Sequence, residues 1–287
     1  MAVKIETVNT AEFKMKYFKF GCGEQTVVVI PGLSLKSVTE SANGIANVFK
    51  LMGDKYTVYF FDRRTDCGED YNVEDMADDT AEALDILGIS GAYVYGVSQG
   101  GMIAQLIALK RPDLVKKLAL ASTTSRFTGE NSAVIEKWAD LAAKKKILEL
   151  INCFIEAVYS KEFAEKFGEL IRQMLIGVSA DELHRFEIYA RACNGFDVYD
   201  KLDKIACPVY AAGATGDKVF GCEPIAELAE KTNAQLYIYE NYSHAVYDEA
   251  PDFIERLVKF FDEKLLLFKT ALYLFDTTLF CYLFSCY

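Results

Sequence analysis

Short apolar runs rich in β-branched and aromatic residues alternate with longer amphipathic stretches over the first 123 residues. The stretch 73–88, VEDMADDTAEALDILG, has helical spacing, acidic residues in its first turn and a glycine at its end, as amphipathic helices do. Strands separated by helix-length segments predict parallel βαβ units. On these patterns we predict two strands within 3–20, further strands at 26–32, 56–62, 91–98 and 116–123, and helices at 38–52, 73–88 and 99–115.

The alternation stops between residues 124 and 203, where helix-like stretches dominate, and then resumes. We predict strands at 207–217 and 234–240 and helices at 222–233 and 250–264. A helical block inside a parallel-sheet protein is typical of a cap over an active site. The predicted fold is therefore an α/β fold with a mostly parallel, doubly wound sheet: residues 1–123 and 204–264 form the core, and 124–203 form an inserted helical cap.

The last 23 residues, 265–287, are crowded with Leu, Phe, Tyr and Cys and lack Gly and Pro. They are long enough to span a bilayer. However, Lys269 and Asp276 lie within them, and each such charge costs about 2.5–3.5 kcal/mol near the centre of a spanning helix. We therefore favour an apolar C-terminal extension beyond the catalytic domain over membrane contact. A helix packed on the domain and a segment lying on a membrane surface stay open as alternatives.

Composition narrows the classes of function. A net charge of −11 disfavours nucleic acid and anionic lipid as partners. The eight Cys are scattered without a CxxC pair, and two His leave few zinc ligands, so we expect no metal and no cofactor. The first ten residues lack the basic start and apolar run of a secretory signal, and the cysteine usage fits reduced thiols in the cytoplasm.

The strongest chemical signal is GVSQG at residues 96–100, a GxSxG motif centred on Ser98. It follows the strand-like GAYVY directly and precedes a helix rich in Ala, Leu and Ile. A nucleophile elbow requires this strand–turn–helix setting. The alternative is a tight turn without a catalytic role, which would explain the five-residue motif but not its setting. We predict Ser98 as a nucleophile, which needs a base to accept its proton.

Two histidines are available as that base. His184 lies within the helical block, in ADELHRFEIYARA, and is expected to be a partly exposed helix residue. His244 lies on a loop directly after the last predicted strand, from which its ring can reach the carboxyl edge of the sheet. We therefore predict His244 as the general base.

The imidazole also needs a carboxylate to fix its tautomer and stabilise its charged form. Asp217 ends the strand-like CPVYAAGATGD and so lies at the same edge. The competitors are Glu240, four residues before His244, and Asp248 and Glu249, which more simply stabilise the start of the last helix. The order Ser98, Asp217, His244 is the one that hydrolases with this elbow use.

These three segments, GVSQGGMIAQ, GATGD and SHAVYDEAPDF, resemble the α/β-hydrolase superfamily of serine esterases and lactonases over most of residues 3–264. The resemblance implies that the backbone amides of Leu33 and Gln99 form an oxyanion hole. The chain departs from the family in having Pro31-Gly32 where many members carry His-Gly. The segment FDRRTDCGED resembles the family's loop after its fourth strand, but it lacks the glycine-rich sequence that is usual there.

We therefore expect a serine hydrolase that cleaves a small or medium, mostly uncharged carboxylic ester or lactone by an acyl-enzyme mechanism. The same residues leave open a carbon–carbon bond hydrolase, a perhydrolase, an acyltransferase and a slow-turnover, receptor-like binding module. The sequence leaves the oligomeric state open. The expected substrate walls come from the cap: Phe127, Trp138 and Met174, with Phe154 and Phe186 as further candidates.

Overall fold

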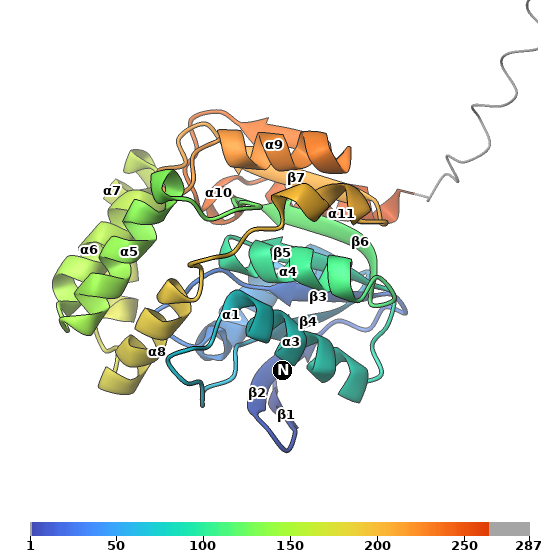
Figure 1. The fold of residues 1–287 in the computed structure, drawn as a ribbon, viewed down its shortest axis with the longest axis horizontal. Coiled ribbons are helices and arrows are strands. Elements are labelled where there is room, and N and C mark those ends of the chain that lie inside the picture. The colour runs from blue at the N-terminus through green and yellow to red at the C-terminus, as the bar shows by residue number, and fades with distance from the viewer. Residues whose placement is uncertain (1, 264–287) are drawn as a thin grey trace, which may run out of the picture.

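The computed structural model describes residues 2–263, and its centre is an eight-stranded sheet in the order β1-β2-β4-β3-β5-β6-β7-β8 (Figure 1). β1 and β2 are antiparallel, β2 pairs antiparallel with β4, and the remaining neighbours are parallel. The mostly parallel, doubly wound sheet predicted from the sequence is thereby confirmed. The strands are β1 (Ile5–Asn9), β2 (Lys14–Phe20), β3 (Thr26–Ile30), β4 (Thr57–Phe61), β5 (Ala92–Val97), β6 (Val115–Ala121), β7 (Val209–Ala214) and β8 (Gln235–Tyr239).

The strand order reverses at β3. The chain goes from β3 to β4 on one side, then crosses back to place β5 on the other side of β3. The loops that leave the carboxyl ends of β3 and β5 therefore diverge, and such a reversal of strand order is the position at which open α/β sheets bind their ligands. Leu33 follows β3 and Ser98 follows β5, so both lie at this point.

Alternate residues of each strand face opposite layers of helices. On β3, Val28 and Ile30 belong to a core that includes residues of α3 (Val73–Ile86), α4 (Gln99–Lys110) and α9 (Glu223–Thr232). Val27 and Val29 belong to the opposite core. That second core includes residues of α1 (Ala42–Val48), α2 (Lys50–Gly53) and α11 (Phe253–Asp262). A strand buried on both faces must be apolar throughout, which is why these strands read as unbroken apolar runs.

The single helix predicted for residues 38–52 is wrong in detail. The chain instead forms a 3-10 turn at Val38–Ser41, then α1 and α2, with a break at Phe49. Phe49 leaves helical geometry with φ −87° and ψ 18°, and its ring packs edge-on against Phe60, with centroids 5.1 Å apart. Tertiary packing of one aromatic ring accompanies the break in the helical periodicity.

Four helices lie between β6 and β7 and form a group at one side of the molecule (Figure 1). We call them the inserted helices: α5 (Gly129–Ala143), α6 (Ile147–Val158), α7 (Lys161–Leu175) and α8 (Ala180–Arg191). A 3-10 turn (Tyr199–Lys204) leads back to β7, and a short helix, α10 (Val246–Glu249), precedes α11. Within residues 2–263, no helix has both the length and the apolar character needed to cross a bilayer. The predicted extension at 265–287 lies outside the described residues.

Candidate active site

Ser98 occupies a sharp turn between β5 and α4. Its backbone has φ 53° and ψ −122°, a conformation that residues other than glycine adopt at a cost of about 1–3 kcal/mol. The end of the adjacent strand β6 holds Ser98 in this conformation, since the Ser98 amide donates to the Ala121 carbonyl at 2.9 Å. In addition, the Thr123 hydroxyl donates to the Ser98 carbonyl at 2.7 Å. The turn is therefore an elbow that presents the Ser98 hydroxyl at the carboxyl edge of the sheet.

Glycines around Ser98 permit this turn through close packing. A Cβ at Gly100 would lie 2.1 Å from the Ile30 carbonyl oxygen, and one at Gly96 would lie 2.5 Å from the Gly100 oxygen. A Cβ at Gly101 would lie 2.6 Å from the Thr123 side chain. Real Cβ atoms do not approach so closely, because steric repulsion rises steeply at these distances. These positions bring α4 against β3 and β6 and so fix the direction of Ser98.

Three side chains from distant parts of the sequence meet at this elbow. His244 Nε2 lies 3.0 Å from Ser98 Oγ, and His244 Nδ1 lies 2.8 Å from Asp217 Oδ2. All three residues are buried, with 6%, 3% and 8% of their surfaces exposed for Ser98, His244 and Asp217. A hydroxyl hydrogen-bonded to an imidazole that is itself oriented by a carboxylate is the arrangement of an activated nucleophile.

Backbone amides hold the Asp217 carboxylate in place. Its Oδ1 accepts from the amides of Val219 at 2.8 Å and Phe220 at 3.1 Å, which leaves Oδ2 for His244. These three hydrogen bonds fix the orientation of the carboxylate plane. The Ser243 hydroxyl donates to the Gly216 carbonyl at 3.1 Å and ties the histidine loop to the aspartate loop.

The two amides expected to form an oxyanion hole flank Ser98. A Cβ at Gly32 would lie 3.1 Å from the Ser98 Cβ, so the backbone leading into Leu33 packs directly against the serine. Gln99 is the first residue of α4, where helix amides have no partner in the helix. Neither the Leu33 nor the Gln99 amide donates to any group within residues 2–263. Both are therefore available to an oxygen placed beside Ser98.

Comparison with known proteins identifies the family. Residues 28–251 match the family model for the α/β-hydrolase fold. The chain belongs to the α/β-hydrolase family. It is 21% identical over 220 residues to 3-oxoadipate enol-lactonase 2 of Acinetobacter baylyi, covering 75% of this chain and 80% of that one. It is 25% identical over 200 residues to a protein assigned as the carbamate hydrolase RutD of Rhizobium rhizogenes, covering 64% and 72% of the two chains.

Solved structures share the fold of this α/β hydrolase. MGS-M2, an α/β hydrolase from a Medee basin deep-sea metagenome library, superposes with a TM-score of 0.81 at 21% identity, over 91% of this chain and 98% of that one. The enol-lactonase of Burkholderia xenovorans LB400 superposes with a TM-score of 0.77 at 18% identity, over 90% and 100% of the two chains. At these identities the likeness concerns the fold alone.

The other titratable candidates of this hydrolase lie away from Ser98. His184 is an exposed residue of α8, as the sequence predicted. Glu240 is exposed. The Asp248 carboxylate accepts from the Tyr159 hydroxyl at 3.5 Å. Glu249 accepts from the Ser160 amide at 2.9 Å. Of the four carboxylates considered, Asp217 is the one that contacts His244.

The aromatic candidates for substrate walls have unlike surroundings. Phe127 packs edge-on against Phe220, whose ring in turn contacts the His244 ring with centroids 5.5 Å apart. Trp138 is buried against Phe154 with centroids 4.9 Å apart. The remaining aromatic candidate, Phe186 on α8, is also buried.

Met174, in contrast, lies on α7 with 54% of its surface exposed. A side chain that faces solvent has no buried substrate wall to complete, and its predicted contact with a substrate stays a prediction. The helical spacing of α7 alone did not distinguish its exposed from its buried face.

Sequence reasoning assigned no role to the Gln99 side chain. It is fully buried, and its Nε2 donates to the Tyr189 carbonyl and, at 3.3 Å, to Cys193 Sγ, which joins the elbow to α8. Burial raises the pKa of the Cys193 thiol to about 11, so the thiol stays protonated at neutral pH. Burial likewise raises the pKa of Tyr189, and its hydroxyl stays a hydrogen-bond donor. Within the described part of the chain, no three His, Cys, Asp or Glu side chains are grouped as metal ligands.

Proposed function

We propose that this α/β hydrolase is a serine hydrolase that cleaves small or medium, mostly uncharged carboxylic esters or lactones through a Ser98 acyl-enzyme. The observation that carries the proposal is the continuous contact from Ser98 through His244 to Asp217, with distances of 3.0 and 2.8 Å. In this proposal His244 is the general base and Asp217 orients it and stays ionised.

The reaction begins when Ser98 Oγ attacks the carbonyl carbon and His244 Nε2 accepts the hydroxyl proton. The oxygen of the tetrahedral intermediate then carries a negative charge, which the amides of Leu33 and Gln99 stabilise at the start of α4, where the helix dipole adds positive charge. His244 next donates its proton to the leaving alcohol, and the acyl group stays on Ser98. Water, deprotonated by His244, releases the acid and restores the serine.

In this proposal residues 124–203, which contain the inserted helices, supply the substrate walls and act as a cap on a core formed by 1–123 and 204–264. Phe127 is the best supported of the wall candidates, because one aromatic ring separates it from His244. The relative from Acinetobacter baylyi is named an enol-lactonase, which favours including lactones in the substrate class. A small-molecule substrate and a cytoplasmic location complete the proposal.

The mechanism is tested by labelling with a fluorophosphonate, which reacts with activated serines, followed by peptide mapping. We expect one label, at Ser98, and no label on Ser98→Ala. The Ser98→Ala variant should lose about 10⁴–10⁶ in kcat on short p-nitrophenyl esters while unfolding at the same temperature as the wild type. Turnover by Ser98→Ala at the wild-type rate contradicts the mechanism. His184→Ala serves as the matched histidine control and should retain activity.

The substrate class is tested with a panel of p-nitrophenyl esters of increasing acyl length, five- and six-membered lactones, and aryl carbamates. We expect kcat/KM to be highest for short or medium esters or for lactones. Carbamates form a separate arm because one relative is assigned as a carbamate hydrolase. Hydrolysis of the carbamates alone would keep Ser98 as nucleophile and overturn the ester and lactone assignment.

A further inference from the structure

Arg63 lies two residues beyond the end of β4, and its guanidinium points into the interior. Its Nη2 donates to the Pro31 carbonyl at 2.9 Å and its Nη1 to the Gly32 carbonyl at 3.4 Å. These are the two carbonyls directly before Leu33 in the chain. The side chain of Arg63 is therefore bonded to the loop that carries one of the proposed oxyanion amides.

The geometry of a peptide bond gives these contacts a consequence. The Gly32 carbonyl and the Leu33 amide belong to the same peptide group, and in a trans peptide the C=O and the N–H point in opposite directions. No cis peptide occurs among the described residues. Holding the Gly32 oxygen toward Arg63 therefore turns the Leu33 N–H away from Arg63. A hydrogen bond to the carbonyl also polarises the peptide group and strengthens its N–H as a donor.

The free-energy cost of burying the Arg63 guanidinium indicates that its hydrogen bonds to the loop stabilise the structure. Only 7% of the residue is exposed, and burial lowers the pKa of its guanidinium. A buried cation is expensive unless its donors are satisfied, and usually a carboxylate does so. Among the side chains that the structure describes, no carboxylate forms an ion pair with Arg63, although the Asp62 carboxylate next to it in the chain opposes the lowering of its pKa. Its terminal nitrogens bond to the loop carbonyls instead, and the Tyr189 ring packs 5.8 Å from the guanidinium carbon.

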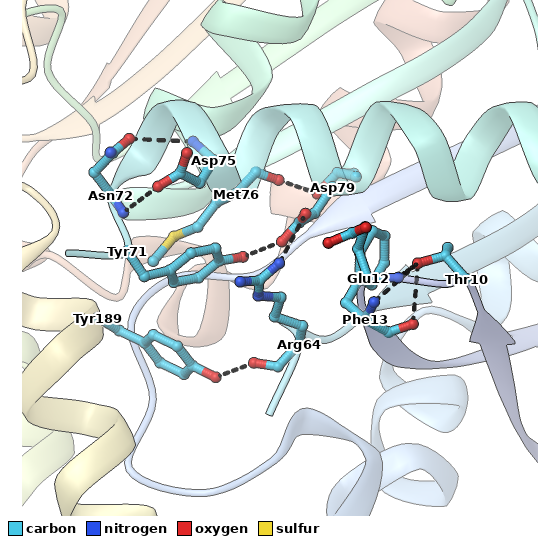
Figure 2. Close-up of polar contacts among 11 residues, drawn as sticks. Thr10, Glu12, Phe13, Arg64, Tyr71, Asn72, Asp75, Met76, Asp79 and Tyr189 are labelled. Atoms are coloured by element: carbon cyan, nitrogen blue, oxygen red, sulfur yellow. Dashed lines mark hydrogen bonds and ion pairs between the residues drawn. The ribbon is translucent and has the colours of Figure 1, made fainter. Parts of the chain in front are cut away.

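The segment that carries Arg63 is anchored on both sides, as Figure 2 shows for its neighbour Arg64. The Arg64 guanidinium lies 3.5 Å from Asp79 on α3, whose carboxylate also accepts from the Tyr71 hydroxyl at 2.7 Å. From α8, the Tyr189 hydroxyl donates to the Arg64 carbonyl at 2.6 Å. The backbone at residues 63 and 64 is thus fixed to both the core and the inserted helices.

We propose that Arg63 is a positioning residue for acyl transfer, which orients the peptide between Gly32 and Leu33 so that the Leu33 amide faces the oxyanion formed at Ser98. The inference rests on the proposed function. In this proposal Arg63 acts through the loop, since the hydrogen bonds of its guanidinium go to the Pro31 and Gly32 carbonyls. Its effect therefore falls on stabilisation of the transition state and leaves substrate binding in the ground state unchanged.

The test compares Arg63→Ala with Arg64→Ala, a neighbouring arginine of the same size whose side chain contacts Asp79 instead of the loop. Loss of one oxyanion donor costs about 10²–10³ in kcat, and we expect a loss of this size for Arg63→Ala with KM within about threefold of the wild type. The affinity for an alkyl boronic acid, which forms a tetrahedral adduct with Ser98, should fall in parallel. Arg64→Ala should lower the unfolding temperature and keep kcat and boronate affinity.

Guanidinium rescue separates positioning from a structural role. Guanidinium chloride, well below its denaturing concentration, should raise kcat of Arg63→Ala and have no such effect on Arg64→Ala, because the cation refills the vacated site. Arg63→Lys, which keeps the charge and loses the fork of two donors, should show a smaller loss of kcat than Arg63→Ala. It also provides the measurement if Arg63→Ala does not fold.

Two outcomes overturn different conclusions. If the wild type is not labelled by fluorophosphonate at Ser98, the proposed function fails and the inference falls with it. If the wild type is labelled and active, but Arg63→Ala and Arg63→Lys keep the wild-type kcat and boronate affinity and lose only thermal stability, the inference about Arg63 alone is wrong.

Discussion

The loops at the carboxyl edge of the sheet and the inserted helices differ in how they use their residues. At the sheet edge, Ser98, Asp217 and His244 are buried and hydrogen-bonded to one another. The inserted helices instead leave large apolar side chains exposed: Leu148, Leu170 and Met174, together with Ile176 directly after α7, each have more than half of their surface exposed. The sheet edge thus holds its polar side chains in one hydrogen-bonded arrangement, whereas the inserted helices present apolar side chains to solvent.

The two regions nevertheless meet through a few hydrogen bonds. The Ala245 amide, next to His244, donates to the Val158 carbonyl at the end of α6 at 2.8 Å. The Gln99 side chain donates to the Tyr189 carbonyl on α8. The inserted helices are thus attached to both the base loop and the nucleophile elbow. Substitutions at the sheet edge or in the inserted helices can therefore show whether a change in one region alters activity or stability through the other.

The largest effect is expected for Asp217→Asn at the sheet edge. The amide keeps the shape of the side chain but favours the wrong tautomer of His244, which lowers kcat by about 10⁴ when this contact acts as in other serine hydrolases. Steady-state kinetics on a p-nitrophenyl ester measures it. Glu240→Gln is the matched control, since Glu240 is an exposed carboxylate close to His244 in sequence. Equal losses for the two variants would contradict the assignment of Asp217.

An intermediate effect, on stability, is expected for Trp138→Ala in the inserted helices. Trp138 is buried against Phe154, and removing such a ring lowers the free energy of unfolding by about 3–5 kcal/mol. Met174→Ala, at an exposed position on α7, should change it by less than about 0.5 kcal/mol. Urea denaturation measures both.

The Trp138→Ala variant also tests whether Trp138 contacts the substrate. If Trp138 is a wall residue, Trp138→Ala also changes the ratio of kcat/KM between long and short acyl esters. An unchanged ratio with lowered stability assigns Trp138 to the core of the inserted helices alone.

The smallest expected effects come from a pair of helix glycines, and they have opposite signs. Gly100→Ala at the elbow places a Cβ 2.1 Å from the Ile30 oxygen and should lower the free energy of unfolding by about 1–3 kcal/mol. At Gly168 in α7 the nearest atom to a new Cβ is 3.7 Å away, so Gly168→Ala should raise it by about 0.5–1 kcal/mol. Thermal unfolding with matched samples checks the signs. Stabilisation by Gly100→Ala would show that the elbow is less tightly packed than described.

The sheet and its edge were predictable because their patterns are local. Buried parallel strands are unbroken apolar runs, and an elbow requires small residues on both sides of Ser98 within five positions. His244 could be predicted because the alternative, His184, belongs to a helical stretch of its own. Each inference used residues that are adjacent in the sequence and whose place at a strand end fixes their place in space.

Features that depend on contacts between distant segments were not predictable. The break at Phe49 is accompanied by packing of its ring against Phe60, a contact that helical spacing does not reveal. The exposure of Met174 depends on which face of α7 meets α6. Arg63 was part of a segment recognised as a loop after a strand, and two consecutive arginines at that place were the available signal. Its hydrogen bonds go to backbone carbonyls of another loop, and such contacts cannot be predicted from the residue types.

The positive φ of Ser98 has a consequence for how this protein can evolve and be engineered. A glycine at position 98 would adopt the same backbone without strain, whereas serine there carries a conformational cost of about 1–3 kcal/mol. Selection for thermal stability and selection for turnover therefore act in opposite directions at this one residue. Stabilised variants of this hydrolase are therefore best sought at positions other than Ser98.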